Sequence, residues 1–437
     1  MQHDDTPQPL YRQRWFLALA ALVLLVRVAF WLLTDHILDS EENFRLVFAT
    51  QPDPWRLTMV GPIHLLLLKF LTMLFARPFI VGPLLSFVCG YASFWLGTAL
   101  AWRIYGNAKA AAATAIFLGF AWPLIQYSRL TKVEPIFTLA LFACLWFLTA
   151  KPRRLLHLVA AGVALTLATG LRYEAWALVP VLTLSVWWRL GGRFRWREAI
   201  AFGLAAGLFP AFWLLFNAIV AGDPMESFHY IADSTFAWRI DEWTAAFLPA
   251  ITVSLLLAIV LGTAVATPSW PAVVGHFLFV AVMIPVIRFG LPSSDMKYMI
   301  APLTLWTLPA GAGVAWLLQR SKWVAPLVAL LLLGFFIETS VGFRGAVRES
   351  QLPPNTDAWV AKLKQEVPAR SRFGVLPSAE LYRAYFQLRL GHDYEFVEST
   401  LAPEGTLGLY LGLERPGDPG CPPGTTPLRL DPWFLCK

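Results

Sequence analysis

Charged side chains are scarce in this sequence of 437 residues: Asp, Glu, Lys and Arg make up 14% of it, whereas hydrophobic residues make up 57%. A soluble domain has about 25% charged and 45–50% apolar residues, so this composition excludes a disordered protein and an ordinary cytosolic enzyme. With four cysteines, the chain is not a small secreted disulfide scaffold either. No basic stretch is interleaved with aromatic residues, so the net charge of +7 indicates the cytoplasmic loops of a membrane protein rather than nucleic-acid binding.

Long apolar runs recur from Trp15 to about Ser340 and predict an all-α polytopic membrane protein. We expect about eleven transmembrane helices, since each needs about 20 predominantly apolar residues. Segment 61–76 is shorter and carries Lys69, so a short interfacial or re-entrant segment is expected there. The expected spans are 15–34, 79–103, 108–127, 133–150, 155–171, 174–190, 197–221, 245–267, 271–289, 297–318 and 322–340.

The distribution of charge predicts the orientation in the membrane. With the N-terminus in the cytoplasm, the inner loops carry the Lys and Arg clusters and the outer loops carry nearly all the acidic residues. An excess of Lys and Arg inside is what sets topology. Two larger regions then lie outside, residues 35–78 and the tail 341–437. The chain has no Asn-x-Ser/Thr site, and we therefore favour a bacterial inner membrane.

The tail 341–437 is expected to be a small extracytoplasmic α/β domain that follows a transmembrane module at 1–340. Its helix-like pieces are 357–367 and 379–390, and its strand-like pieces are 373–376 and 407–413. Cys421 and Cys436 lie in a Pro- and Gly-rich stretch and could form a disulfide if the tail is outside the cytoplasm.

Three carboxylates, Asp39, Glu41 and Glu42, directly follow the first span. They repel one another, so at least one should have a cationic partner or hold its proton more tightly. Such a cluster can supply a general base or an acid pair at the boundary between water and lipid. The alternative is a solvated external loop with no chemical role.

A second cluster contains Arg129, Lys132 and Glu134. On a helical turn the two cations would share a face, which suits an anion such as a phosphate. Glu134 opens the next span, where a carboxylate meets the favourable end of the helix dipole. A simple helix cap is an equally good interpretation of Glu134.

Three further charged turns lie at the predicted outer ends of spans. Arg172 and Glu174 stand two apart and would not face each other on one helix, so each is expected to have a partner elsewhere. Lys297 starts a late span and can hold a lipid phosphate or snorkel to the interface. Asp223, after Asn217, can be turn chemistry alone.

Together, these clusters suggest carboxylates and cations around one external cavity near the leaflet boundary. Such a layout suits an enzyme that takes a phosphate-bearing lipid from the membrane and transfers its head group. Arg and Lys would stabilise the charge of the leaving phosphate, and a carboxylate would deprotonate the incoming hydroxyl.

The order of these motifs resembles the integral-membrane glycosyltransferases of the GT-C fold. It is most similar to the branch of protein O-mannosyltransferases, aminoarabinose transferases and related bacterial enzymes that use polyprenyl-phosphate sugars. Arg172-Tyr173-Glu174-Ala175-Trp176 is the most specific match, Glu41 stands where the family usually has Asp, and Lys297 stands where it has Arg. The other matching segments are 40–44, 61–64, 128–135, Asn217 with 222–224, and 297–302.

The resemblance implies that a sugar is transferred from a polyprenyl-phosphate carrier on the non-cytoplasmic face, with inversion at the anomeric carbon. Glu41 is then the general base, with Asp39 and Glu42 as its neighbours, and no metal is expected to be obligatory. The donor phosphate would be bound by Lys297, Arg129 and Arg172. The substrates would be positioned by Glu134, Glu174, Tyr298 and His64.

Two other interpretations compete with a transferase. A transporter or flippase predicts charges buried in mid-helix and helices broken at the bilayer centre, and among the early residues only Arg27 lies deep in an apolar run. An O-antigen ligase or polymerase of another fold would handle the same lipid-linked glycans. The acceptor, whether glycolipid, wall polymer or protein, is open.

Overall fold

The fold is that of a computed structural model, and the description covers most but not all of the chain. The described residues are 10–34, 61–75, 78–151, 154–189, 196–233, 259–260, 271, 273–280, 297–320, 322–349, 355–368, 371–375, 386, 390, 395–398, 409–413, 427–430 and 433–436.

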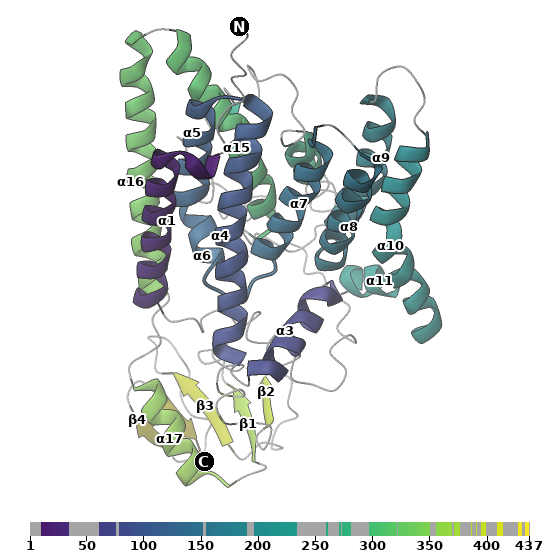
Figure 1. Cartoon of the computed structure of the whole chain (residues 1–437). Coiled ribbons are helices and arrows are strands. Elements are labelled where there is room, and N and C mark those ends of the chain that lie inside the picture. Colours follow the sequence, from purple (N-terminus) through teal and green to yellow (C-terminus); the bar gives the residue numbers. More distant parts are fainter. Residues whose placement is uncertain are drawn as a thin grey trace, which may run out of the picture.

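Most of the described chain is helical, and the long helices form one bundle (Figure 1). The α-helices are α1 (Arg14–Leu33), α3 (Pro62–Phe75), α4 (Pro78–Tyr105), α5 (Ala108–Phe120), α6 (Trp122–Tyr127), α7 (Glu134–Leu148), α8 (Leu155–Leu171), α9 (Leu178–Arg189), α10 (Trp196–Val220), α11 (Glu226–Asp233), α15 (Lys297–Arg320), α16 (Ala325–Glu349) and α17 (Thr356–Glu366). Short 3₁₀ helices are η1 (Leu10–Arg12), η3 (Tyr173–Ala177) and η5 (Lys322–Val324).

Five of the described helices are long and apolar enough to cross a membrane: Arg14–Leu33, Ile80–Tyr105, Trp196–Val220, Met299–Arg320 and Ala325–Gly342. Large apolar side chains are exposed along the outer faces of α1, α10 and α16, as expected for surfaces that contact lipid rather than water. The chain is therefore a polytopic α-helical membrane protein. Of the eleven expected spans, 245–267 and 271–289 lie largely outside the described residues.

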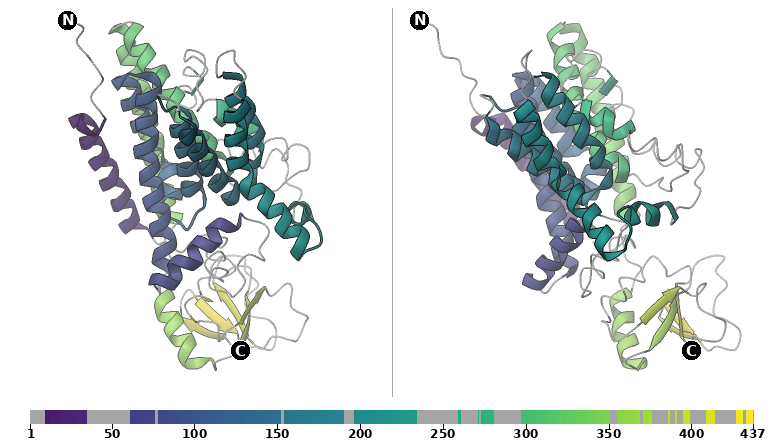
Figure 2. Two further views of the ribbon diagram at one scale, coloured as in Figure 1. Left: turned by 45° about the vertical axis from the view of Figure 1, so that its right-hand side comes forward. Right: turned by 90° about the vertical axis from the view of Figure 1, so that its right-hand side faces the viewer.

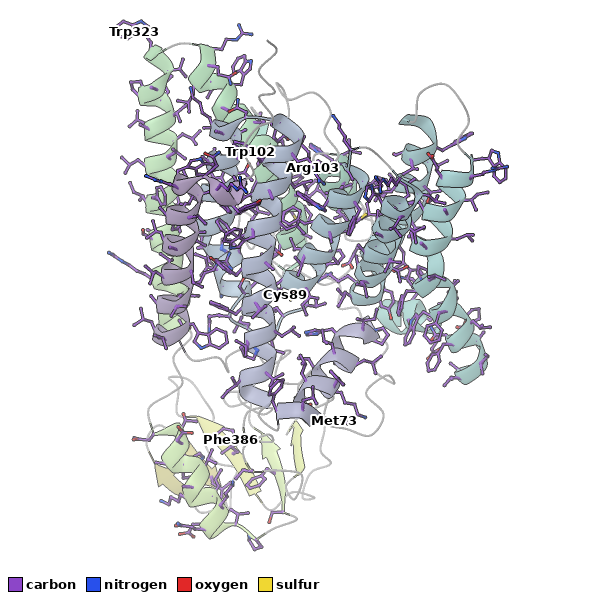
Figure 3. All side chains as sticks on the ribbon, in the orientation of Figure 1. Met73, Cys89, Trp102, Arg103, Trp323 and Phe386 are labelled. Atoms are coloured by element: carbon purple, nitrogen blue, oxygen red, sulfur yellow. The ribbon has the colours of Figure 1, made fainter. Side chains whose placement is uncertain are left out.

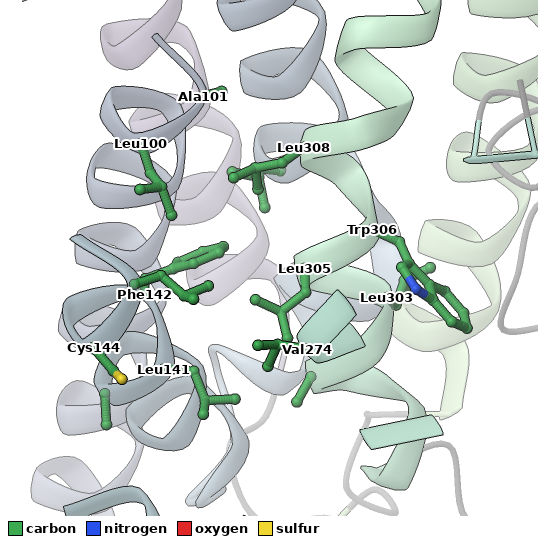
Figure 4. Packing of buried hydrophobic residues seen from close by; sticks show 14 of the residues in the cluster. Leu100, Ala101, Leu141, Phe142, Cys144, Val274, Leu303, Leu305, Trp306 and Leu308 are labelled. Atoms are coloured by element: carbon green, nitrogen blue, oxygen red, sulfur yellow. The ribbon is translucent and has the colours of Figure 1, made fainter. Parts of the chain in front are cut away.

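Helices from distant parts of the sequence form the core of the bundle. The α8 helix packs against α7 and α10, and α15 packs against α5. Figure 4 shows Leu100, Phe142 and Leu305 as members of the buried cluster between α4, α7 and α15. These side chains are almost completely buried, so the core keeps the ends of these helices in fixed relative positions.

One expected span is not a continuous helix. Segment 108–127 divides into α5 and α6 at Ala121, which leaves the helical region with φ −59° and ψ 116°. Pro123 is the physical reason, because proline disfavours helical backbone at the preceding residue and cannot donate to the preceding turn. The expected span at 174–190 also begins as the 3₁₀ helix η3 before it continues as α9.

The C-terminal part contains a five-stranded sheet with the strand order β2-β1-β3-β5-β4. Strand β1 pairs in parallel with β2 and β3, whereas β5 pairs antiparallel with β3 and β4. Two strands coincide with the strand-like pieces of the sequence, and three were not expected. The strands are β1 (Arg372–Val375), β2 (Glu395–Glu398), β3 (Leu409–Leu413), β4 (Pro427–Leu430) and β5 (Trp433–Cys436).

The sheet and α17 lie beyond one end of the helical bundle, as both views in Figure 2 show. Trp359 and Leu363 of α17 and Phe373 of β1 have fully buried side chains, as in a small core between helix and sheet. The last span was expected to end at residue 340, but α16 continues to Glu349. Cys436 belongs to β5, while its expected partner Cys421 lies outside the described residues.

Candidate functional site

The loop between α6 and α7 lies in a groove of small residues on α4. Ser86 Oγ donates to the carbonyl of Lys132 at 3.0 Å and accepts from its N–H at 3.1 Å. A Cβ atom on Gly90 would lie 2.1 Å from Ser128 Oγ, so only glycine leaves room for the loop there. Non-helical backbone at membrane depth needs such internal partners, and α4 supplies them.

The two cations of this loop are buried. Arg129 is 3% and Lys132 is 2% exposed. The guanidinium of Arg129 lies 5.4 Å from the ring centre of Phe30 on α1, and Lys132 Nζ lies 5.2 Å from that of Tyr127. Aromatic rings stabilise cations in such positions. The helical turn expected over these residues is not formed, because α6 ends at Tyr127 and α7 starts at Glu134.

Arg172 lies between two carboxylates. Its Nη1 donates to Glu134 Oε1, while Nε and Nη2 donate to the two oxygens of Glu174 at 3.3 and 2.7 Å. The expectation that Arg172 and Glu174 do not face each other is wrong, because Arg172 ends α8 in an extended conformation (φ −148°, ψ 134°). The expectation of a distant partner is confirmed for Arg172, because Glu134 lies 38 residues earlier, whereas the partner seen for Glu174 is Arg172 itself.

Glu134 does not act as a helix cap. The N-cap of α7 is Val133, and no side-chain cap bond is present. The Glu134 side chain is 1% exposed, and its Oε2 atom has no hydrogen-bond partner among the described residues. A buried carboxylate oxygen with no donor is costly, so this oxygen marks the pair with Arg172 as a candidate binding element rather than a helix end.

The start of α3 packs directly on the end of α8. A Cβ atom on Gly61 would lie 2.2 Å from the carbonyl oxygen of Gly170, and one on Gly170 would lie 2.1 Å from Ile63 Cδ1. This approach brings the motif that contains His64 next to the Arg172 motif, as Figure 1 shows for α3 and α8. The His64 side chain is fully buried.

Asn217 is tied to α11 beyond its own helix. Ser227 Oγ accepts from Trp213 Nε1 at 3.0 Å and from Asn217 Nδ2 at 3.1 Å. The connecting turn is the tight turn expected at 222–224: Gly222 has φ +75° and Asp223 Oδ1 accepts from the Met225 N–H at 2.9 Å.

Aromatic rings attach α11 to the Arg172 motif. Phe228 lies 5.3 Å from both Tyr173 and Trp176, measured between ring centres. The segment that contains Asn217 and Asp223 therefore meets the turn that contains Arg172 and Glu174. Two motifs separated in the sequence lie side by side at one end of the bundle.

Three of the expected site residues, Asp39, Glu41 and Glu42, lie outside the described residues. Lys297 and Tyr298 form the first turn of α15, and only their backbone is described. In the part of the chain that is described, no group of three His, Cys, Asp or Glu side chains could hold a metal ion. The expectation of no obligatory metal stays a prediction.

A small cavity lies beside Ser128, where the α6–α7 loop begins. Arg27 and Ser128 line it on one side, and Ile300 and Thr304 of α15 line it on another. Ile300 and Thr304 follow Lys297 by three and seven residues, so the three positions share one face of α15. Sequence reasoning noted Arg27 only as a charge deep in an apolar run and did not assign it to the site.

No protein-family model and no curated protein sequence match this chain. Its fold is similar to that of ArnT from Cupriavidus metallidurans. The crystal structure with bound undecaprenyl phosphate gives a TM-score of 0.60 at 15% identity over 97% of both chains. The apo state gives a TM-score of 0.61 at 14% identity over 97% of both chains.

A second similar structure is the archaeal oligosaccharyltransferase AglB from Archaeoglobus fulgidus, in complex with an inhibitory peptide and a dolichol-phosphate. Its TM-score is 0.54 at 10% identity, over 88% of this chain and 64% of that chain. At these identities the likeness shows the fold. The GT-C fold implied by the sequence resemblance is therefore confirmed.

Proposed function

We propose that the chain is a membrane glycosyltransferase that transfers a sugar from a polyprenyl-phosphate carrier to an acceptor on the non-cytoplasmic face. The observation that carries the proposal is the fold shared over 97% of both chains with a protein whose crystal structure holds undecaprenyl phosphate. The AglB structure with dolichol-phosphate supports the same class of carrier. A cluster of buried charges at one end of the bundle supports a site that handles an anionic lipid head group.

The proposed reaction is a single displacement that inverts the anomeric carbon. A carboxylate of the first external loop, Glu41 with Asp39 and Glu42 beside it, takes the proton of the acceptor hydroxyl. The acceptor oxygen then bonds to the anomeric carbon while the bond from that carbon to the phosphate oxygen breaks. The bonding electrons leave with the polyprenyl phosphate, whose negative charge Lys297 and Arg129 stabilise.

The proposed role of Arg172 follows from its partners. One guanidinium faces the carboxylates of Glu134 and Glu174, so a phosphate that approached Arg172 would have to compete with both. We assign the donor phosphate to Lys297 and Arg129, as the resemblance implies, with Arg172 as the third candidate. Glu134 and Glu174 are the groups suited to hydrogen-bond sugar hydroxyls, with Arg172 holding both carboxylates in place. Tyr298 and His64 complete the proposed substrate-positioning set.

The orientation of the chain in the membrane is part of the same proposal. The N-terminus lies in the cytoplasm of a bacterial inner membrane, and the C-terminal region with its sheet, taken as a separate domain after residue 340, lies on the outer side. The bundle end nearest the sheet is the end at which α3 and α11 lie (Figure 1). This common location supports an external site that the C-terminal region can reach.

A reconstituted transfer assay tests the proposal. The purified full chain in liposomes is supplied with radiolabelled polyprenyl-phosphate sugars and a lipid extract as acceptor. Wild type is expected to transfer label, and Glu41→Gln and Lys297→Ala are each expected to lower the rate at least about 100-fold, the lower end of the range for a general base. The matched control is Arg103→Met, because Arg103 is exposed and, among the described residues, contacts the Trp146 carbonyl and ring. Translocation of the lipid-linked sugar without transfer would support a flippase instead.

A further inference from the structure

Arg27 is a charged side chain in the middle of α1, an otherwise apolar helix. It is 3% exposed, and no described residue forms an ion pair with it. An ionisable group inside a membrane bundle is expensive and marks a functional requirement. The residues that Arg27 contacts identify that requirement.

The first contact of Arg27 is with the end of α5, just before the helix break at Ala121. Arg27 Nη2 donates to the carbonyl oxygen of Leu118 at 3.3 Å, within the last turn of α5. The final carbonyls of a helix have no partner within the helix. Arginine can satisfy them, and its charge is favoured at this end of the helix dipole. Arg27 thus offsets part of the cost of a broken helix inside the membrane.

The second contact lies at the other end of α6. Arg27 Nη1 donates to Ser128 Oγ at 2.8 Å, and Ser128 Oγ donates in turn to the Leu124 carbonyl. One guanidinium therefore contacts both the last turn of α5, which precedes α6, and Ser128, which directly follows α6. Gly90 of α4 packs directly against both partners of this bond. A Cβ at Gly90 would lie 3.1 Å from Arg27 Nη1 and would also press on Ser128.

We propose that Arg27 is a positioning residue that clamps both ends of α6 and thereby fixes the α6–α7 loop, with Arg129 and Lys132, against α4. The consequence for catalysis rests on the proposed function, in which Arg129 binds the donor phosphate. The clamp as a structural feature does not depend on the proposed function. The cavity beside Arg27 and Ser128 is also lined by Ile300 and Thr304 of α15, which lie on the face of α15 that Lys297 shares.

Hydrogen–deuterium exchange on the full chain tests the clamp independently of activity. In Arg27→Met, peptides that cover 118–134 should exchange at least tenfold faster than in wild type, while peptides from α8 and α10 keep their wild-type rates. Arg27→Lys keeps the charge with fewer donors and should restore part of the protection. Unchanged exchange at 118–134 would overturn the proposal, and so would an equal increase throughout the bundle.

A second variant tests the clamp through a substitution in α4. Gly90→Ala should increase exchange over 118–134 without substitution of Arg27, because the new Cβ would press on Ser128 and on the end of the Arg27 side chain. Gly207→Ala in α10 is the matched control, because a Cβ there meets nothing within 4 Å. Arg103→Met is the control for removal of an arginine, since Arg103 lies toward the end of α4 opposite the sheet, far along the helix from Cys89 and its neighbour Gly90 (Figure 3). A local effect of Gly207→Ala or Arg103→Met on 118–134 would count against the clamp.

The KM values for transfer separate a positioning role from a general loss of folded protein, because such a loss lowers the rate but leaves KM unchanged. Arg27→Met should raise the donor KM at least tenfold and leave the acceptor KM within twofold of wild type. A fall in kcat with both KM values unchanged would contradict the positioning role. Absence of transfer by wild type itself would remove the proposed function but leave the exchange result for the clamp intact.

Discussion

Arg172 at the end of α8 is paired with Glu134 at the start of α7, and the side chains are 9% and 1% exposed. The bond joins the turn that follows one helix to the first turn of another. No residue in the described part of the chain donates to the buried Oε2 atom of Glu134. Glu174 holds the other side of the same guanidinium. The three groups form a preorganised polar centre in an apolar bundle, where a new ligand hydroxyl could find an acceptor.

The two carboxylates should differ in their contribution to stability. Glu134→Gln should lower the free energy of unfolding by about 2 kcal/mol, because it removes the negative charge from a buried ion pair and replaces a charge-assisted hydrogen bond with a neutral acceptor. Glu174→Gln should cost less than about 1 kcal/mol, since the Glu174 side chain is 21% exposed and water screens the pair. Thermal unfolding in detergent checks the order of the two values. An equal or larger loss for Glu174→Gln would contradict this description of the cluster.

Gly61 should tolerate alanine much less well than Gly170. The new Cβ of Gly61→Ala would meet backbone atoms of Gly170 and Leu171, whereas that of Gly170→Ala would meet the end of the Ile63 side chain. Backbone cannot yield as a side chain does, so Gly61→Ala should separate α3 from α8 and lower the Tm further. Gly207→Ala should leave the Tm unchanged or raise it, as alanine is the better helix former. Equal melting temperatures for the first two variants would exclude the close contact.

Ser227 should be important for the packing of α11 on α10. Ser227→Ala would leave Trp213 Nε1 and the Asn217 amide without their shared acceptor in a buried position, at a cost of about 1–3 kcal/mol. Ser227→Thr keeps the hydroxyl and serves as the matched control. Faster hydrogen exchange in α11 for Ser227→Ala alone is the expected result. Identical exchange in both variants would rule out the role of the hydroxyl.

Acid should weaken the turn after α10 through Asp223. The Met225 N–H, and with it His229, holds the pKa of Asp223 below its ordinary value of 3.8. A lowered pKa in the folded state means that this contribution to stability is complete above the unfolded pKa and is lost as pH falls through the folded pKa. The difference in Tm between wild type and Asp223→Asn should therefore shrink from pH 6 to pH 3. A constant difference would show that the Asp223 charge does not contribute.

Hydrophobic runs were sufficient to predict the helical architecture, but not its interruptions. Residues 15–34, 79–103 and 197–221 coincide with α1, α4 and α10, because spanning helices must be long and apolar. The break at Ala121 was missed, although Pro123 offered a signal for it. Strands β2, β4 and β5 were not predicted; each is four residues long, like β1, which was predicted, so length alone does not separate them.

For the candidate site, local sequence identified the motifs but not their contacts. The charged turns at 128–134 and 172–174 were found, yet the pairing of Arg172 with Glu134 depends on how α7 packs on α8. The pairing with Glu174 was missed because helical spacing was assumed where the chain is extended. Arg27 could be recognised as unusual from its apolar surroundings, but its contacts lie 91 and 101 residues away.

The most direct test of the central claim is a structure of the full chain with polyprenyl phosphate bound in a lipid nanodisc. The account predicts that the phosphate lies within about 3 Å of Lys297 Nζ or the Arg129 guanidinium, with the isoprenoid passing into the lipid beside the bundle. A phosphate bound at another surface, with Lys297, Arg129 and Glu41 sharing no common pocket, would contradict it.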